Sequence, residues 1–373
     1  MSIQEDVADV EESLLTDVCG PIPKEDYLSS GNTLINLACS GTLYGALAKG
    51  HYHWMCGDSS SGKTFFTLNC MAEASVNRHF DEYQLIYNNV EDGAKMEVER
   101  YFGSRLAQRM KPPKRDKDGS PQFPMTLEEF YYDLDDRLEL VKKGKSPPFI
   151  ELLDSIDALD SEQSGDKFDK KKSAFRKGKS KEEPGEYTDG KAKINSQNIR
   201  KIAAKIRDSR CILIVLSQTR DNMTAKTMFD PKTIVSGGRA LKFYATWQLW
   251  SSVKGKIKKT VNGHDRQIGI TSKIAIKKNR LTGKEWDIEV PIYWSSGIDD
   301  TGAMVDFLCS EGRWTDTKGI IKADDLGLEG MRTEGLIHHI EQNNLEPDLK
   351  QIVFEVWKDI ERKCHVERKP RYS

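Results

Sequence analysis

Residues 57–64 read Gly-Asp-Ser-Ser-Ser-Gly-Lys-Thr, which matches the phosphate-binding loop pattern G-x-x-x-x-G-K-[ST]. The apolar run 51–56 before the loop predicts a buried strand, and residues 65–75 after it predict a helix. This order places the loop at a helix N-terminus, where free backbone N–H groups and the positive end of the helix dipole face an anion. Lys63 would reach the β- and γ-phosphates of a nucleotide, and the Thr64 hydroxyl would ligate Mg²⁺. The alternative is a glycine-serine turn that carries Lys-Thr by chance, and the strand–loop–helix order argues against it.

Hydrolysis of a nucleotide needs carboxylates beside this loop. Residues 149–155 form an apolar run that contains Asp154 at its end, the form of a Walker B strand. Residues 84–89 predict another strand, and Glu91 lies just past its C-terminal end, at the edge where ligand-binding residues gather in parallel sheets. We predict that Glu91 orients the attacking water; the alternative is a helix-start acid beside Asp92. The predicted cofactor-binding residues are Gly57, Asp58, Ser59, Ser60, Ser61, Gly62, Lys63, Thr64 and Asp154, of which Thr64 and Asp154 are the predicted metal ligands.

Composition indicates a soluble globular chain. The 373 residues, 31% charged and 37% apolar, leave room for one large core and a smaller appended domain. The chain has no apolar run of about 18 residues and no basic-then-apolar leader, which predicts neither a membrane span nor secretion. The seven cysteines contain no C-x-x-C pair, so zinc has no support. Four of them lie in apolar stretches and are predicted to be buried in a reducing compartment: Cys39, Cys56, Cys70 and Cys211.

Helix and strand signals alternate over residues 29–300, which predicts an α/β core with a mainly parallel central sheet. Residues 1–28 resemble an acidic N-terminal arm, a candidate polymerisation element, and residues 301–373 a small α/β C-terminal domain. Residues 111–124 are rich in Lys, Pro, Asp and Gly and predict a loop. Residues 126–129 then predict a capping box that opens an amphipathic helix.

Five segments, in a fixed order along the chain, carry a family resemblance. They are Ser30–Ala38, Gly57–Thr64, Asn89–Glu91, Leu153–Ser155 and Gly237–Ala245. Together they resemble the RecA-type recombinases, most closely a phage RecA-like protein of the UvsX type. The segment Gly237-Gly238-Arg239-Ala240-Leu241-Lys242-Phe243-Tyr244-Ala245 is the most specific of the five. The resemblance covers roughly residues 29–360 and implies a RecA-like P-loop NTPase core.

The resemblance also implies roles at matching positions. Lys63 and Glu91 would act on ATP and its attacking water, with Mg²⁺ as the metal, and Gln218 would sense the γ-phosphate. Lys278 and Arg280 would reach ATP held by a neighbouring subunit; the alternative is ordinary edge-strand cations that discourage aggregation. Nothing matches the adenine contacts of the family, so no adenine-stacking residue is predicted.

Two polar segments at the nucleotide edge are predicted DNA-binding loops. The formal net charge of the chain is −1, yet residues 167–181 carry eight Lys or Arg against one acid. Lysines neutralise phosphates without sequence preference, and aromatic rings stack on bases. The alternative for the first loop is a solvated linker. The predicted contacts are Lys170, Lys171, Lys172, Phe175, Arg176, Lys177 and Lys179 in residues 161–193, and Arg220, Lys226, Phe229 and Lys232 in residues 220–236.

The combined prediction is an ATP-dependent recombinase that binds single-stranded DNA, is a DNA-dependent ATPase and takes up double-stranded DNA during homologous pairing and strand exchange. A head-to-tail contact between subunits that does not close would build a helical filament. The expected location is the cytoplasm, that of a bacterial host if the protein is phage-encoded. One alternative is a hexameric RecA-fold helicase or translocase, which the segment 237–245 disfavours. Another is a non-catalytic, ATP-switched DNA-binding accessory protein, which the sequence does not separate from a recombinase.

Overall fold

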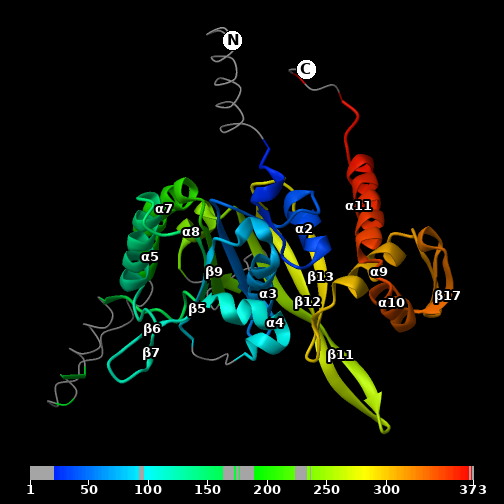
Figure 1. Ribbon diagram of the computed structural model, residues 1–373, viewed down its shortest axis with the longest axis horizontal. Coiled ribbons are helices and arrows are strands. Elements are labelled where there is room, and N and C mark those ends of the chain that lie inside the picture. Colours follow the sequence, from blue (N-terminus) through cyan, green and yellow to red (C-terminus); the bar gives the residue numbers. More distant parts are fainter. Residues whose placement is uncertain are drawn as a thin grey trace.

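The computed structural model describes residues 21–91, 96–162, 172–173, 176, 189–222, 233–235, 237–368 and 371 (Figure 1). Within these residues the central sheet has ten strands, in the order β14-β13-β12-β11-β3-β9-β8-β4-β5, with β10 paired to β9. The neighbours from β11 to β5 are parallel, and the pairs on the β12 side are antiparallel. The predicted α/β core with a mainly parallel sheet is therefore confirmed. The strands are β3 (Tyr52–Gly57), β4 (Gln84–Asn89), β5 (Met110–Lys111), β8 (Phe149–Asp154), β9 (Ile212–Asp221), β10 (Thr233–Val235), β11 (Trp247–Val261), β12 (His264–Asn279), β13 (Asp287–Tyr293) and β14 (Gly297–Ile298).

Helices cover both faces of this sheet, so that the core lies in two layers (Figure 1). One face packs against α2 (Thr33–Ser40), α3 (Lys63–Val76), α4 (Val98–Arg109) and α9 (Asp300–Ser310). The other face packs against α5 (Leu127–Lys142), α7 (Asp189–Ser209) and α8 (Arg239–Tyr244). Parallel strands that are buried on both faces usually consist of nearly continuous apolar runs. All six residues of β3 and all six residues of β8 are buried. The four cysteines predicted to be buried are free thiols in this core.

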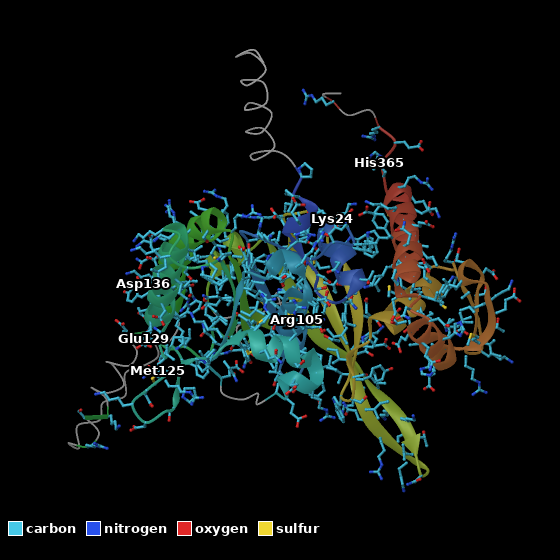
Figure 2. The ribbon with its side chains drawn as sticks, viewed as in Figure 1. Lys24, Arg105, Met125, Glu129, Asp136 and His365 are labelled. Carbon is cyan, nitrogen blue, oxygen red and sulfur yellow. The ribbon has the colours of Figure 1, made fainter. Side chains whose placement is uncertain are left out.

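The start of α5 shows how local sequence directs a helix. The Thr126 side chain accepts from the Glu129 backbone N–H, and the Glu129 carboxylate reaches back to the backbone of Thr126 and Met125. Figure 2 shows Met125 and Glu129 side by side at this end of the helix. Residues that recur at helical spacing, from Leu127 to Leu138, face the sheet. The predicted capping box and core-facing helix are confirmed.

Residues 111–124 differ from the prediction of a plain loop. Within them β6 (Lys114–Arg115) pairs antiparallel with β7 (Pro121–Gln122), and β5, which ends at Lys111, forms the edge of the central sheet. The turn between the two short strands is held by Asp116, whose carboxylate accepts from the backbone N–H groups of Asp118 and Ser120. Asp and Gly in this segment therefore mark a hairpin turn.

The C-terminal part adds a three-stranded antiparallel sheet and two helices beside α9 (Figure 1). Its elements are β15 (Thr315–Thr317), β16 (Ile320–Ala323), η3 (Asp324–Leu326), β17 (Leu328–Arg332), α10 (Thr333–Gln342) and α11 (Glu346–Lys363). Trp314 and Trp357 are both buried in the same core cluster as α9. The predicted small α/β C-terminal domain is present, and its boundary at residue 301 stays a prediction. Residues 1–20 of the predicted N-terminal arm lie outside the described residues. The segment that follows contains η1 (Lys24–Asp26) and β1 (Tyr27–Leu28), which pairs with β2 (Leu47–Ala48). A further 3-10 helix, η2 (Arg78–Phe80), follows α3.

A two-stranded ribbon projects from the sheet where β11 and β12 extend beyond their neighbouring strands (Figure 1). β3 pairs with β11 only as far as Ser251, and β13 pairs with β12 only from Gly269. The ribbon turns at Asn262 and Gly263, whose φ angles of 53° and 75° are those of a two-residue hairpin loop. This hairpin is absent from our sequence-based prediction, although Asn-Gly between two strands is a strong hairpin signal.

A buried ion pair ties α5 to the sheet beneath the nucleotide edge. Glu151 on β8 is fully buried, and its Oε1 accepts from Arg137 Nη2 at 2.6 Å and from Asn88 Nδ2 at 2.6 Å. Burial raises the pKa of Glu151, and Arg137 opposes that shift. A carboxyl group with a raised pKa binds more protons in the folded state, so its contribution to stability falls as pH rises above its ordinary range.

We expect Arg137→Met to lower the free energy of unfolding by about 3–5 kcal/mol near neutral pH, because Glu151 would keep a buried charge without its partner. The loss in free energy of unfolding should shrink toward pH 5, because protonation of Glu151 removes the unpaired buried charge. Adding Glu151→Gln to Arg137→Met should recover much of the lost stability. Urea unfolding at pH 5 and pH 8 measures both effects. An equal loss at both pH values would contradict this account.

Candidate nucleotide and DNA site

The phosphate loop connects β3 to α3, and two of its glycines are required by geometry. A Cβ on Gly57 would lie 2.1 Å from Ser251 Oγ and 2.3 Å from the Ser251 carbonyl oxygen. Gly62 precedes the first turn of α3 with a φ of 89°, a conformation that side chains disfavour. Among the residues that the structure describes, no side chain caps this helix. The loop and the first turn of α3 therefore form a helix N-terminus suited to an anion.

Lys63 lies within this loop and is 9% exposed. Its Nζ donates to the carbonyl oxygens of Gly57 at 2.8 Å and Asp58 at 2.7 Å. Burial lowers the pKa of Lys63, and the nearby carboxylates of Asp154, Glu91 and Asp58 oppose that shift. A cation that donates to two carbonyls in a desolvated loop would gain strongly from an incoming phosphate.

The predicted metal ligands lie side by side. Thr64 Oγ1 donates to Asp154 Oδ2 at 2.7 Å, and Tyr87 Oη on β4 donates to the same oxygen at 3.2 Å. Burial raises the pKa of Asp154, while the hydrogen bonds from Thr64 and Tyr87 oppose the shift. Hydroxyl and carboxylate oxygens suit Mg²⁺, which keeps several waters and phosphate oxygens in its shell. Among the described residues no three or more His, Cys, Asp or Glu gather to hold a metal.

Glu91 lies in a turn after β4 and meets residues from two other strands. Its Oε1 accepts from Gln218 Nε2 at 2.8 Å and from Ser155 Oγ, and its backbone N–H donates to the Asp154 carbonyl at 3.2 Å. Because β4, β8 and β9 are neighbouring parallel strands, their carboxyl ends meet at one edge. The structure thus brings together Lys63, Glu91 and Gln218 with the pair Thr64 and Asp154.

Two residues in this site are missing from our sequence-based prediction. Tyr87 holds Asp154, as described above, and Asp157 Oδ2 accepts from the Gln218 backbone N–H at 2.8 Å. Burial raises the pKa of Asp157. Asp157 lies three residues beyond Asp154 at the same strand end, which is a usable signal. For Tyr87 the sequence indicates only a place on β4, because the direction of its side chain depends on the packing of the sheet.

Lys278 and Arg280 lie away from the phosphate loop of their own chain. The register pairs Lys278 with Gln248, and Gln248 with Trp54, which lies in the middle of β3, three residues before Gly57. Lys278 Nζ donates to three backbone carbonyls at the end of α8, those of Lys242, Phe243 and Ala245. Arg280 Nη2 donates to the Phe243 carbonyl as well. Burial, together with the charges of Arg280 and Lys242, lowers the pKa of Lys278 to about 8. A role in another subunit's site remains a prediction.

The predicted DNA loops are described only in part. Arg220 is exposed on β9, where it pairs with Ile234 of β10, so that residues 219–221 and 233–235 form an antiparallel stem. Lys172 and Arg176 of the first loop are exposed. The remaining predicted contacts lie outside the described residues: Lys170, Lys171, Phe175, Lys177, Lys179, Lys226, Phe229 and Lys232.

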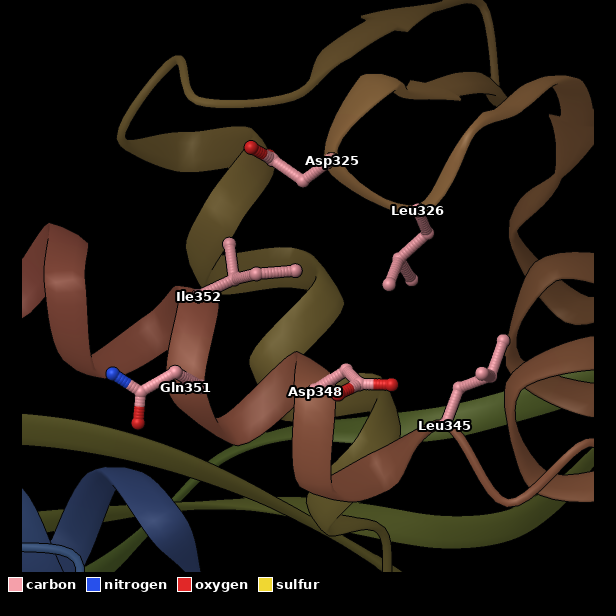
Figure 3. A pocket seen from close by; sticks show the side chains of 6 residues that line it. All are labelled: Asp325, Leu326, Leu345, Asp348, Gln351 and Ile352. Atoms are coloured by element: carbon pink, nitrogen blue, oxygen red, sulfur yellow. The ribbon is translucent and has the colours of Figure 1, made fainter.

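A separate hollow of about 390 Å³ lies in the C-terminal part (Figure 3). It is lined by Asp325, Leu326, Leu345, Asp348, Gln351 and Ile352. Asp325 there already binds the Arg313 guanidinium and accepts from Trp314 Nε1 at 2.8 Å. The hollow contains none of the predicted site residues. Across the described ranges, no helix is long and apolar enough to cross a bilayer.

Comparison with known proteins agrees with this geometry. The family model of the RecA N-terminal domain matches residues 180–299. The chain is 27% identical over 288 residues to the protein RecA of Cereibacter sphaeroides. The matched residues make up 77% of this chain and 71% of that relative. It is 34% identical over 134 residues to the protein RecA of Streptococcus pyogenes, covering 34% of this chain and 35% of the relative. A match to the protein RecA of Brucella anthropi, 34% identical over 115 residues, covers 31% of this chain and 30% of the relative. With its phosphate loop, its mainly parallel sheet and these similarities, the chain resembles the RecA-type recombinases.

Proposed function

We propose that this protein is an ATP-dependent recombinase that assembles on single-stranded DNA as a helical filament and promotes homologous pairing and strand exchange. It would hydrolyse ATP with Mg²⁺ in a DNA-dependent manner and take up double-stranded DNA during pairing. The observation that carries the proposal is the 2.8 Å hydrogen bond from Gln218 Nε2 to Glu91 Oε1. Gln218 is followed within two residues by the stem of the second predicted DNA loop, so one side chain links the hydrolytic carboxylate to that loop.

The chemistry would divide among the chain's own residues. Bound ATP with Mg²⁺ supplies the labile phosphoryl bond and the charge of the metal. Lys63 would leave the carbonyls of its loop and hold phosphate oxygens, while Thr64 and Asp154 would hold the metal directly or through water. Glu91 would orient the attacking water through the carboxylate that now accepts from Gln218. Lys278 and Arg280 would stabilise developing charge at the site of a neighbouring subunit.

Electron microscopy of the protein with single-stranded DNA and a non-hydrolysable ATP analogue tests the assembly. The proposal requires helical filaments that depend on both ligands. Closed rings would favour a helicase or translocase. Filaments without strand exchange between labelled homologous oligonucleotides would favour an accessory protein. The similarity to a phage protein of the UvsX type stays a prediction.

The basic loop gives a quantitative test of DNA binding. We expect changing Lys170, Lys171, Lys172 and Lys177 to glutamine to weaken single-stranded DNA binding and flatten its dependence on salt. Each lost phosphate contact should remove roughly 0.7 from the slope of log affinity against log salt for single strands. Fluorescence anisotropy of a labelled oligonucleotide at several salt concentrations measures the slope.

The matched control removes four exposed cations near the amino ends of β8 and β9, away from the nucleotide edge: Lys142, Lys143, Lys145 and Arg207. This control should keep the slope of the unaltered protein. If the loop variant also keeps that slope, residues 161–193 act as a solvated linker and not as a DNA contact.

A further inference from the structure

The end of β9 is held by consecutive side-chain contacts to other elements. Trp54 Nε1 donates to Ser217 Oγ at 2.8 Å, and Gln218 contacts Glu91 as described above. The next residue, Thr219, donates through Oγ1 to the carboxylate of Asp58. This last contact has no part in the hydrolytic arrangement described so far.

The contact joins two segments with different predicted ligands. Asp58 is the second residue of the phosphate loop. Thr219 pairs with Val235 and is the first residue of the β9–β10 stem that carries the second DNA loop. One charge-assisted hydrogen bond therefore runs directly from the phosphate loop to the base of the DNA loop, beside the contact made by Gln218.

Asp58 is also connected to the residue that would hold phosphate. Its carbonyl oxygen accepts from Lys63 Nζ at 2.7 Å and from Ser61 Oγ at 2.7 Å, and its N–H donates to the Ser251 carbonyl at 3.3 Å. Engaging a phosphate turns the Lys63 ammonium away from this carbonyl. Phosphate charge also repels a carboxylate within a few ångströms. Both changes act on Asp58, so its bond to Thr219 responds to what the loop holds.

We propose that the Asp58–Thr219 hydrogen bond is a latch that restrains the DNA-loop stem until the phosphate loop takes up a nucleotide. Thr219 is then a positioning residue for DNA binding. The inference rests on the proposed function, because it takes ATP as the nucleotide and DNA as the ligand of the loop. A ligand shifts a conformation only through differential contacts with its states, and the latch supplies such a contact.

The direction of the effect separates a latch from a structural hydrogen bond. Thr219→Val keeps the shape and β-propensity of threonine but removes the donor. In this variant the stem is released without nucleotide, so DNA affinity without nucleotide should rise toward the level reached with a non-hydrolysable ATP analogue. The ratio of the two affinities should fall roughly tenfold, near the lower end of the range for one charge-assisted hydrogen bond. Thr219→Ser keeps the hydroxyl and should restore the ratio.

Oligonucleotide anisotropy with and without the analogue measures this ratio. Because coupling is reciprocal, the effect of DNA on the affinity of a fluorescent ATP analogue should shrink by the same factor. Amide hydrogen exchange on the protein alone gives a readout without ligands: the stem amides of Thr233 and Val235 should exchange faster in Thr219→Val than in Thr219→Ser. Circular dichroism confirms that each variant is folded.

Several results would overturn the latch. An unchanged ratio in Thr219→Val, beside a normal response in the unaltered protein, removes it. Equal loss of DNA affinity with and without the analogue shows that Thr219 is merely structural. If the unaltered protein shows no response of DNA affinity to the analogue, the proposed function itself fails, and the latch fails with it.

Discussion

Changing Glu91 to glutamine should leave ATP binding intact and slow hydrolysis by at least about a hundredfold, the scale of a lost general base. The amide keeps the shape of the side chain, and its oxygen still accepts from Gln218 or Ser155. It would lose the charge that we propose to orient and deprotonate water. Phosphate release with and without single-stranded DNA, beside titration of a fluorescent ATP analogue, separates turnover from binding.

Lys63→Ala is the matched comparison for Glu91→Gln. Lys63 contacts the loop that would surround phosphate, so its removal should weaken nucleotide binding itself. The two variants should therefore fail at different steps. Hydrolysis by Glu91→Gln at the original DNA-stimulated rate would assign the catalytic carboxylate elsewhere, with Asp154 and Asp157 as the neighbouring carboxylates to examine.

The second large effect concerns the proposed site shared between subunits. Lys278→Ala with Arg280→Ala should preserve nucleotide binding by the isolated subunit and lower DNA-stimulated hydrolysis roughly a thousandfold, as expected when cations on a transferring phosphoryl group are lost. The register places both residues away from the phosphate loop of their own chain, so a direct contact within one subunit is not expected. ATP should also no longer lengthen filaments.

Mixing this double variant with Glu91→Gln is the sharper experiment. An interface works when the double variant supplies Glu91 and the Glu91→Gln subunit supplies Lys278 and Arg280. Random assembly at equal amounts makes about one interface in four of this kind. Phosphate release should then recover to a clear fraction of the original rate. No recovery at any ratio, with mixed assembly confirmed, would show that the site is built within one chain.

The structure also requires a control for this test. Lys278 and Arg280 donate to the carbonyls at the end of α8, so their removal could loosen that helix. Lys277→Ala removes the adjacent exposed cation, which lies 4.6 Å from the centre of the Trp250 ring. The Lys277→Ala protein should hydrolyse ATP normally. Thermal unfolding of both variants shows whether the double change acts through stability instead.

Local features of this protein were readable from its sequence. The phosphate loop and the capping box at Thr126 depend on contacts between residues close in the chain, and short apolar runs mark the strands that end at Asn89 and Asp154. Backbone geometry and hydrogen bonding at a helix start are settled within a few residues, so short patterns carry them. The strand order was not readable, and the hairpin of β11 and β12 was missed although Asn262 and Gly263 signalled its turn.

The sequence by itself determined which side chains stand at strand ends and in the phosphate loop, and so the chemistry that we propose for them: phosphate binding, a hydroxyl with a carboxylate for a metal, and Glu91 for water. Only the tertiary structure decided which of them meet. Gln218 lies 127 residues from Glu91 and touches it because β9, β8 and β4 are neighbours in the sheet. The same packing turned Tyr87 toward Asp154 and set Thr219 against Asp58. Side-chain direction and strand order depend on burial across the whole core, and no local pattern specifies them.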